Sequence, residues 1–186
     1  MLLALAGVML MVADSRALSS SEKSPEEEAA DSVRQATEKY NAGVKHMEKG
    51  KAYDAQADSL FAFNYRATKT AKAENEYRKA VKDFEKAASL QPKMVEAFNN
   101  LGFCRRKLNL LKESLEAYDA ALAIDSLYAL AHEYRGELFL AMGDLNRARA
   151  ELDVLKRLNP AYADTLSMSI EHFQLQQFDN EMKKKQ

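Results

Sequence analysis

The fold is decided by LGFCRRKLNLLKESLEAYDAALAID (residues 101–125) and by its repeat, RGELFLAMGDLNRARAELDVLKRLN (residues 135–159). The two stretches start 34 residues apart and place Gly102 opposite Gly136. A fixed period of this length is typical of proteins that stack copies of one small helical unit. The repeat therefore indicates an array of similar units in which each unit packs mainly against its neighbours.

Further columns keep the same spacing and extend the repeat toward the N-terminus. They are Ala80, Ser114 and Ala148; Phe84, Tyr118 and Leu152; Ala87, Ala121 and Leu155; and Pro92, Ser126 and Pro160. Small residues let two helices cross closely, and the larger residues fill the space beside them. Over residues 36–160 these columns resemble the tetratricopeptide repeat (TPR) pattern of a large residue, Leu-Gly, an aromatic residue, then Ala, Phe and Pro at fixed offsets.

The resemblance implies an all-α fold: a right-handed superhelical array of antiparallel helix pairs, with about three TPR repeats plus a C-terminal capping helix. We expect the repeats over residues 33–160, the capping helix over 161–180 and a basic tail over 181–186. The low counts of glycine (6) and proline (3) also favour long helices. Turns are expected at Leu108–Asn109 and Gly143–Asp144.

The first repeat is irregular and predicts an insertion near residues 56–79. Its opening helix matches through Gly43 and a turn at Gly50, and a second helix can start at Tyr53, yet the clear match resumes only at Ala80. One interpretation is a long second helix or a helix–loop–helix insertion. The other is an extended segment that places alternating aromatic side chains on one side as a contact for a partner. These side chains are Phe61, Phe63 and Tyr65.

The N-terminus carries an unbroken apolar run of twelve residues, Leu2–Ala13. A helix of that length is shorter than a bilayer core and has the length of a signal-peptide hydrophobic region. No Lys or Arg precedes the run, and a buried N-terminal helix is the alternative. We expect residues 1–17 to form a signal peptide or N-terminal hydrophobic segment, followed by a polar linker over 18–32 in which Ser24 and Pro25 start a helix. The expected location is periplasmic or secreted, with a membrane anchor if the segment stays uncleaved.

Motifs of enzyme chemistry are incomplete in this sequence. His132-Glu133 begins like the zinc-binding H-E-x-x-H, but Gly136 takes the place of the second histidine. Cys104 is the single cysteine, and a packing role in a helix is expected for it. No glycine-rich phosphate loop is present, and a net charge of -1 gives no reason to expect nucleic acid. We therefore expect no catalytic residue, no metal, no cofactor and no enzymatic activity.

A binding function follows from the TPR resemblance. In that family, ligands lie along the concave groove made by the first helix of each pair, which implies a non-catalytic scaffold or adaptor for a protein or peptide partner. By register, the groove residues are Tyr40, Asn41, Asn99, Asn100, Phe103, Arg106, Lys107, Glu133, Tyr134 and Glu137. The alternative is a self-associating or membrane-tethered structural subunit of an envelope assembly.

One subclass of TPR ligand is not expected. Repeats that clamp the carboxylate tail of chaperones resemble each other in carrying cations and amides at fixed groove positions. Asn100 matches the middle asparagine, but Tyr40 and Val44 replace the first pair, and Leu130 and Tyr134 replace the third. Without those cations a bound carboxylate lacks its charge-assisted hydrogen bonds.

Overall fold

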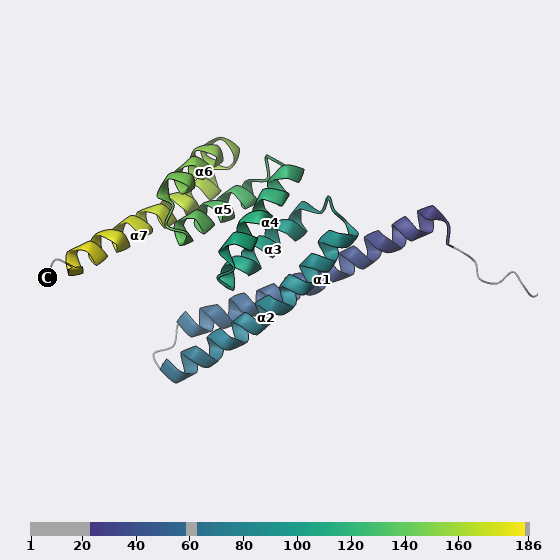
Figure 1. The fold of residues 1–186 in the computed structure, drawn as a ribbon, viewed down its shortest axis with the longest axis horizontal. Coiled ribbons are helices and arrows are strands. Elements are labelled where there is room, and N and C mark those ends of the chain that lie inside the picture. The colour runs from purple at the N-terminus through teal and green to yellow at the C-terminus, as the bar shows by residue number, and fades with distance from the viewer. Residues whose placement is uncertain (1–22, 59–62, 185–186) are drawn as a thin grey trace, which may run out of the picture.

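The computed structural model describes residues 23–58 and 63–184. Within these ranges the chain forms helices and short turns, in the order α1 (Pro25–Asp58), α2 (Phe63–Leu90), α3 (Val95–Lys107), α4 (Leu111–Ile124), α5 (Ala129–Ala141), α6 (Leu145–Leu158) and α7 (Pro160–Lys184). Helices α1 and α2, α3 and α4, and α5 and α6 pack as antiparallel pairs, and α7 packs against α5 and α6 (Figure 1). The predicted all-α fold of stacked helix pairs is confirmed.

Helix α1 starts earlier than the expected linker allows. The Glu27 N–H donates to Ser24 Oγ at 3.2 Å, and the Ser24 N–H donates to Glu27 Oε2 at 2.9 Å. This reciprocal capping box satisfies two backbone donors at the helix start. The helix start at Ser24 and Pro25 is confirmed, and the linker prediction is wrong for residues 25–32, which are helical.

The first pair is a long hairpin, since α1 has 34 residues and α2 has 28, whereas α3 to α6 have 13 or 14 each. Small buried residues recur every seven positions along α1, at Ala36, Gly43, Gly50 and Ala57. A Cβ at Gly43 would lie 2.7 Å from Phe84, and one at Gly50 would lie 2.6 Å from Tyr77. Because a seven-residue spacing keeps one helix face against its partner, the aromatic rings of α2 pack onto the small residues of α1.

The predicted turn at Gly50 is therefore wrong. Gly50 is a close helix–helix contact, and α1 continues past Tyr53 to Asp58. The Tyr77 hydroxyl donates to Asp54 Oδ2 at 2.9 Å and ties the outer part of the hairpin together. The expected insertion near 56–79 lengthens both helices of the first pair, with residues 59–62 outside the described part of the chain.

The second and third pairs differ in what fills the space beside their glycines. A Cβ at Gly102 would lie 2.6 Å from Tyr118 of the same pair, and Ser114 Oγ donates to the Gly102 carbonyl at 2.7 Å. The atoms nearest to a Cβ at Gly136 all belong to Leu166 of α7, the closest at 2.5 Å. Leu166 of the capping helix, and not Leu152 as the repeat register predicts, is therefore nearest to Gly136, while Leu152 packs against the same core cluster.

The turns within these pairs lie where they are expected. Asn109 and Gly143 are the two described residues with positive φ, at 59° and 78°. At the C-terminus, α7 includes residues 181–184, so the expected basic tail is the last helical turn as far as Lys184. None of the helices in the described ranges combines the length and hydrophobicity that a bilayer crossing requires.

Candidate functional site

Helices α1, α3 and α5 are the first members of their pairs and contact one another in sequence, α1 with α3 and α3 with α5. We call their common surface the α1–α3–α5 face. Its aromatic side chains Phe103 and Tyr134 lie 5.3 Å apart between ring centroids, and behind them Phe103 lies 6.1 Å from the buried ring of Tyr77 on α2. The structure thus joins residues that the sequence analysis selected on two different helices.

Arg106 of α3 connects this row to α5. Its Nη2 donates to Glu137 Oε2 at 2.5 Å. Its guanidinium carbon lies 5.6 Å from the ring centroid of Phe103 and 6.0 Å from that of Tyr134. A planar cation between aromatic rings, with a carboxylate at one end, is held firmly in place. The predicted residues Arg106, Tyr134 and Glu137 therefore form one contact group.

The cations at the C-terminal end of α3 are linked to α1. Lys107 Nζ lies 2.7 Å from Asp54 Oδ2. From α1, Lys51 Nζ lies 4.9 Å from the ring centroid of Phe103 and 3.0 Å from Glu48 Oε1. Lys51 and Asp54 were missed by the sequence analysis because the supposed turn at Gly50 removed them from this helix.

Glu133 of α5 differs from the other charged residues of this face in its burial and in its lack of a partner among the described residues. Its side chain is 5% exposed. In the described part of the chain, no hydrogen bond or ion pair of its carboxylate is present. Burial and the neighbouring Glu137 raise its pKa to about 7, and Arg106 offsets only part of that effect. The residue is thus largely buried next to a like charge, while the cation that acts on it, Arg106, is bound to Glu137.

Half-buried tyrosines surround the N-terminal ends of α3 and α5. The Tyr40 hydroxyl accepts a hydrogen bond from Asn100 Nδ2 at 3.2 Å. Burial raises the pKa of Tyr128 to about 12, and Glu96, Tyr40 and Tyr162 add to the rise. The Tyr128 phenol therefore stays neutral near pH 7. Tyr128 and Tyr162 were missed, although their separation of 34 residues is itself a repeat signal.

Two of the predicted residues do not join this arrangement. Asn99 is 0% exposed, and its Nδ2 donates to Asn100 Oδ1 at 3.3 Å. The prediction that Asn99 contacts a partner is wrong, since no surface of it is accessible. Asn41 is exposed and lines a hollow formed by α1 alone, beside Lys45 and His46. Among the described residues, Asn41 makes none of the polar or ring contacts that connect the others.

The aromatic residues of the expected insertion are helical where the structure describes them. Phe63 and Tyr65 lie in the first turn of α2, so an extended segment is wrong for these positions. Phe61 lies outside the described residues. A role of these residues in binding stays a prediction.

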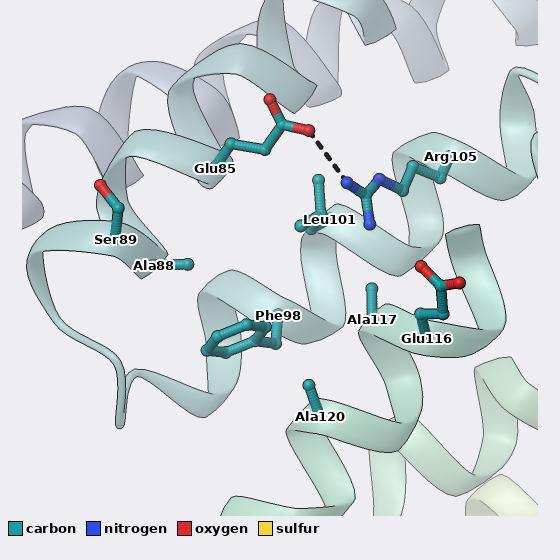
Figure 2. A pocket seen from close by; sticks show the side chains of 9 residues that line it. All are labelled: Glu85, Ala88, Ser89, Phe98, Leu101, Arg105, Glu116, Ala117 and Ala120. Carbon is teal, nitrogen blue, oxygen red and sulfur yellow. Dashed lines mark hydrogen bonds and ion pairs between the residues drawn. The ribbon is translucent and has the colours of Figure 1, made fainter.

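A separate hollow of about 400 Å³ opens between α2, α3 and α4 (Figure 2). Small and apolar side chains line most of it, including Ala88, Leu101 and Ala117. Arg105 Nη2 donates to Glu85 Oε1 at 2.9 Å across its edge. None of the predicted site residues lines this hollow.

The cysteine and histidine side chains that could take part in catalysis are packed inside the fold. Cys104 is 0% exposed, and burial raises the pKa of its thiol to about 12, so the packing role is confirmed and the thiolate is disfavoured. His132 is 7% exposed, and its Nδ1 lies 2.6 Å from Glu151 Oε2, so it takes part in the packing of the third pair. Within the described ranges, no group of three or more His, Cys, Asp or Glu side chains is arranged to hold a metal ion.

Comparisons with known proteins give similarity in structure only. No protein-family model matches the sequence, and no curated protein sequence matches it significantly. Among solved structures, the chain is similar to the Yersinia enterocolitica type III secretion chaperone SycD in complex with a peptide of the translocator YopD, at 19% identity and a TM-score of 0.50. The match covers 68% of this chain and 93% of that chain.

Two TPR domains give similar matches, each over 68% of this chain. The Arabidopsis OM64 TPR domain is 17% identical with a TM-score of 0.49, and 98% of it is covered. The first TPR of Spaghetti (RPAP3), bound to the HSP90 peptide SRMEEVD, is 16% identical with a TM-score of 0.49, and 96% of it is covered. At such identities the similarity concerns the arrangement of the helices, not the side chains of a site.

Proposed function

We propose that this chain is a non-catalytic adaptor that binds a peptide segment of a partner protein along the α1–α3–α5 face. The observation that carries the proposal is the contact group of Phe103, Arg106 and Tyr134, which joins two helix pairs through ring and cation contacts. Phe103 is buried and supports the group from behind, whereas Arg106 and Tyr134 are half-buried. Arginine and tyrosine are among the residue types that dominate binding energies at protein interfaces.

The fold supports a peptide as the class of ligand. SycD, whose solved structure contains a YopD peptide, shares the arrangement of helices over 68% of this chain. This support is an analogy of fold, so the side chains of this chain must supply the recognition. A clamp for a C-terminal carboxylate stays excluded from the proposal, because Tyr40, Val44, Leu130 and Tyr134 occupy its positions.

The proposal is tested by selecting binders to the full chain from a displayed library of random peptides. Tyr134→Ala removes a ring at the centre of the face, and Ile124→Ala removes a 37% exposed apolar side chain from the end of α4 as the control. We expect selected peptides to bind Tyr134→Ala at least about tenfold more weakly, as for a central interface residue, and to bind the control like the parent. Circular dichroism verifies that both variants keep their helices.

Either of two results would contradict the proposal. Peptides that bind the parent and Tyr134→Ala with equal affinity would place the site elsewhere. Recovery of no peptide above background would remove peptide binding as the function.

A second candidate function is self-association through α7. Four exposed apolar side chains recur along this helix with spacings of three, four and seven residues, at Met168, Leu175, Phe178 and Met182. Such spacing gathers them on one side of the helix, as in coiled-coil seams. Sedimentation velocity distinguishes this candidate: a dimer in the parent that becomes a monomer in Leu175→Lys would support a structural subunit.

Export also belongs to the proposal. The supporting observation is the apolar run Leu2–Ala13, which lies outside the described residues. Removal of a segment near residue 17 during export would lower the mass of the mature chain, and mass spectrometry of the protein from its native source measures that difference. A retained segment in a membrane fraction would favour an anchored form.

A further inference from the structure

The carboxylate of Glu133 lacks a counter-ion in the folded chain. The side chain is 5% exposed, and no hydrogen bond or ion pair of it is present in the described part of the chain. The charged groups that act on it are Glu137 on its own helix and Arg106 on α3. A buried charge without a partner is costly, so proteins generally retain one only where it has a task.

The cations already present on the α1–α3–α5 face have other partners. Arg106 Nη2 is bound to Glu137 Oε2 at 2.5 Å, and Lys107 Nζ lies 2.7 Å from Asp54 Oδ2. Lys51 Nζ lies 3.0 Å from Glu48 Oε1. A cation for the charged form of Glu133 would therefore come from outside the described chain or from a rearrangement that breaks one of these pairs.

The surroundings of Glu133 are suited to a cationic side chain. Its neighbour Tyr134 is half-buried, and burial together with Glu133 and Glu137 raises the pKa of Tyr134 to about 12. The ring of Tyr134 lies 5.3 Å from that of Phe103 and 6.4 Å from that of Tyr118. Neutral aromatic rings of this kind attract ammonium and guanidinium groups.

We propose that the partner segment places a lysine or arginine side chain against Glu133, beside the ring of Tyr134. The inference rests on the proposed peptide binding along the α1–α3–α5 face and adds the chemistry of its specificity. A basic side chain supplies the missing charge and several donors to the carboxylate, and its aliphatic part covers the aromatic rings. A metal ion fits less well, because within the described residues no group of three acidic, cysteine or histidine ligands is available.

The test uses the random-peptide selection in parallel on the full chain, on Glu133→Gln and on Glu116→Gln. Glu116 is an exposed glutamate of α4 that lines the separate hollow, so its variant removes the same charge elsewhere. We expect the parent and Glu116→Gln to enrich peptides with Lys or Arg at one aligned position, and Glu133→Gln to lose that enrichment.

A double-mutant cycle then measures the contact directly. One enriched peptide and its version with norleucine in place of the basic residue are titrated against the parent and Glu133→Gln by calorimetry. We expect norleucine to weaken binding to the parent by at least about tenfold, as for a charge-assisted hydrogen bond, and to change binding to Glu133→Gln by less than about twofold. Binding of the basic peptide to the parent should weaken about tenfold from pH 8 to pH 6, as Glu133 is protonated.

The outcomes separate this inference from the proposed function. Peptides that bind the face, and are weakened by Tyr134→Ala, but show no basic position would overturn the inference while the adaptor function stands. Equal loss from norleucine in the parent and in Glu133→Gln would place the basic residue elsewhere and also overturn it. Failure to select any peptide would overturn both.

Discussion

The two faces of α5 differ in whether the buried charge on them has a partner. Toward α6, the carboxylate of Glu151 contacts His132 Nδ1 at 2.6 Å and Arg135 Nη2 at 2.8 Å. Toward α3, Glu133 has no such partner in the described part of the chain, yet both glutamates are 5% exposed. Equal burial therefore does not indicate an equal role. A paired buried charge belongs to the fold, whereas an unpaired one marks a surface that requires something more.

The protonation states follow from these contacts. His132 Nε2 also lies 3.0 Å from the carbonyl oxygen of Ser126, so both ring nitrogens donate when the imidazole is charged. The hydrogen bond to Glu151, above all, raises the pKa of His132. Glu133 is affected in the other sense, since its raised pKa reflects a charge that the folded state disfavours. One face of α5 thus stabilises charge and the other destabilises it.

The largest expected effect comes from breaking the paired face. Glu151→Ala leaves His132 and Arg135 without their common carboxylate, and loss of one partner of a buried pair costs roughly 3–5 kcal/mol. Because Arg135 keeps Asp119 at 2.6 Å, we expect a decrease of about 3 kcal/mol in the free energy of unfolding. Urea unfolding at neutral pH, followed by circular dichroism, measures it.

Glu116→Ala is the control for Glu151→Ala, because it removes an exposed glutamate from α4. A surface change of this kind usually alters stability by less than about 0.5 kcal/mol. If the two variants lose the same stability, the network around Glu151 does not support the third pair, and the contrast between the faces of α5 fails.

The sequence predicted the repeated part of the fold better than the first pair and the site. The 34-residue columns located Gly102 against Tyr118, because close crossings require small residues at fixed positions. The sequence alone does not distinguish a glycine in a turn from a glycine that packs against an aromatic ring, and Gly50 was therefore predicted as a turn. The distinguishing signal is the small residue at every seventh position, Ala36, Gly43, Gly50 and Ala57. A continuous helix explains all four.

The site was predicted only by position along the helices. Repeat register placed Asn99 and Glu133 at equivalent sites, 34 residues apart, but could not show that one is fully buried and that the other lacks a counter-ion. Such differences depend on side chains contributed by distant helices, for example Tyr40 on Asn100 and Leu166 on Gly136. These differences are determined by tertiary packing, and a repeat position in the sequence carries no information about it.

A smaller change in the free energy of unfolding, opposite in sign to that of Glu151→Ala, is expected for a substitution of the unpaired Glu133. Glu133 has a pKa of about 7 in the folded chain against an ordinary value of 4.5, and each pKa unit corresponds to about 1.4 kcal/mol. The group stabilises the fold below pH 4.5, and that contribution is lost as the pH rises to about 7. We therefore expect Glu133→Gln to increase the free energy of unfolding at pH 8 by about 1–2 kcal/mol, less than the full equivalent of the pKa difference because solvent screens part of the charge.

Urea titrations of the parent and Glu133→Gln at several pH values measure this difference. The stabilities of the two proteins should approach each other near pH 4.5 and diverge toward pH 7, with the variant more stable. A variant that is less stable than the parent at pH 8 would show that Glu133 has a favourable partner after all, and the comparison with Glu151 would lose its basis.

The smallest expected effect on stability is the pH dependence that His132 contributes. It tests the face of α5 on which the buried charges are paired. Because the folded pKa of His132 is raised above 6.5, its contribution to stability is complete below pH 6.5 and is lost as the pH rises through the folded value. Glu133→Gln removes the overlapping titration, so thermal unfolding of this variant above pH 6.5 should show a residual fall in Tm. That fall should vanish in Glu133→Gln combined with His132→Gln. A fall of equal size in both would assign it to other groups, and it would mean that the Glu151 contact does not hold the imidazole in its charged form.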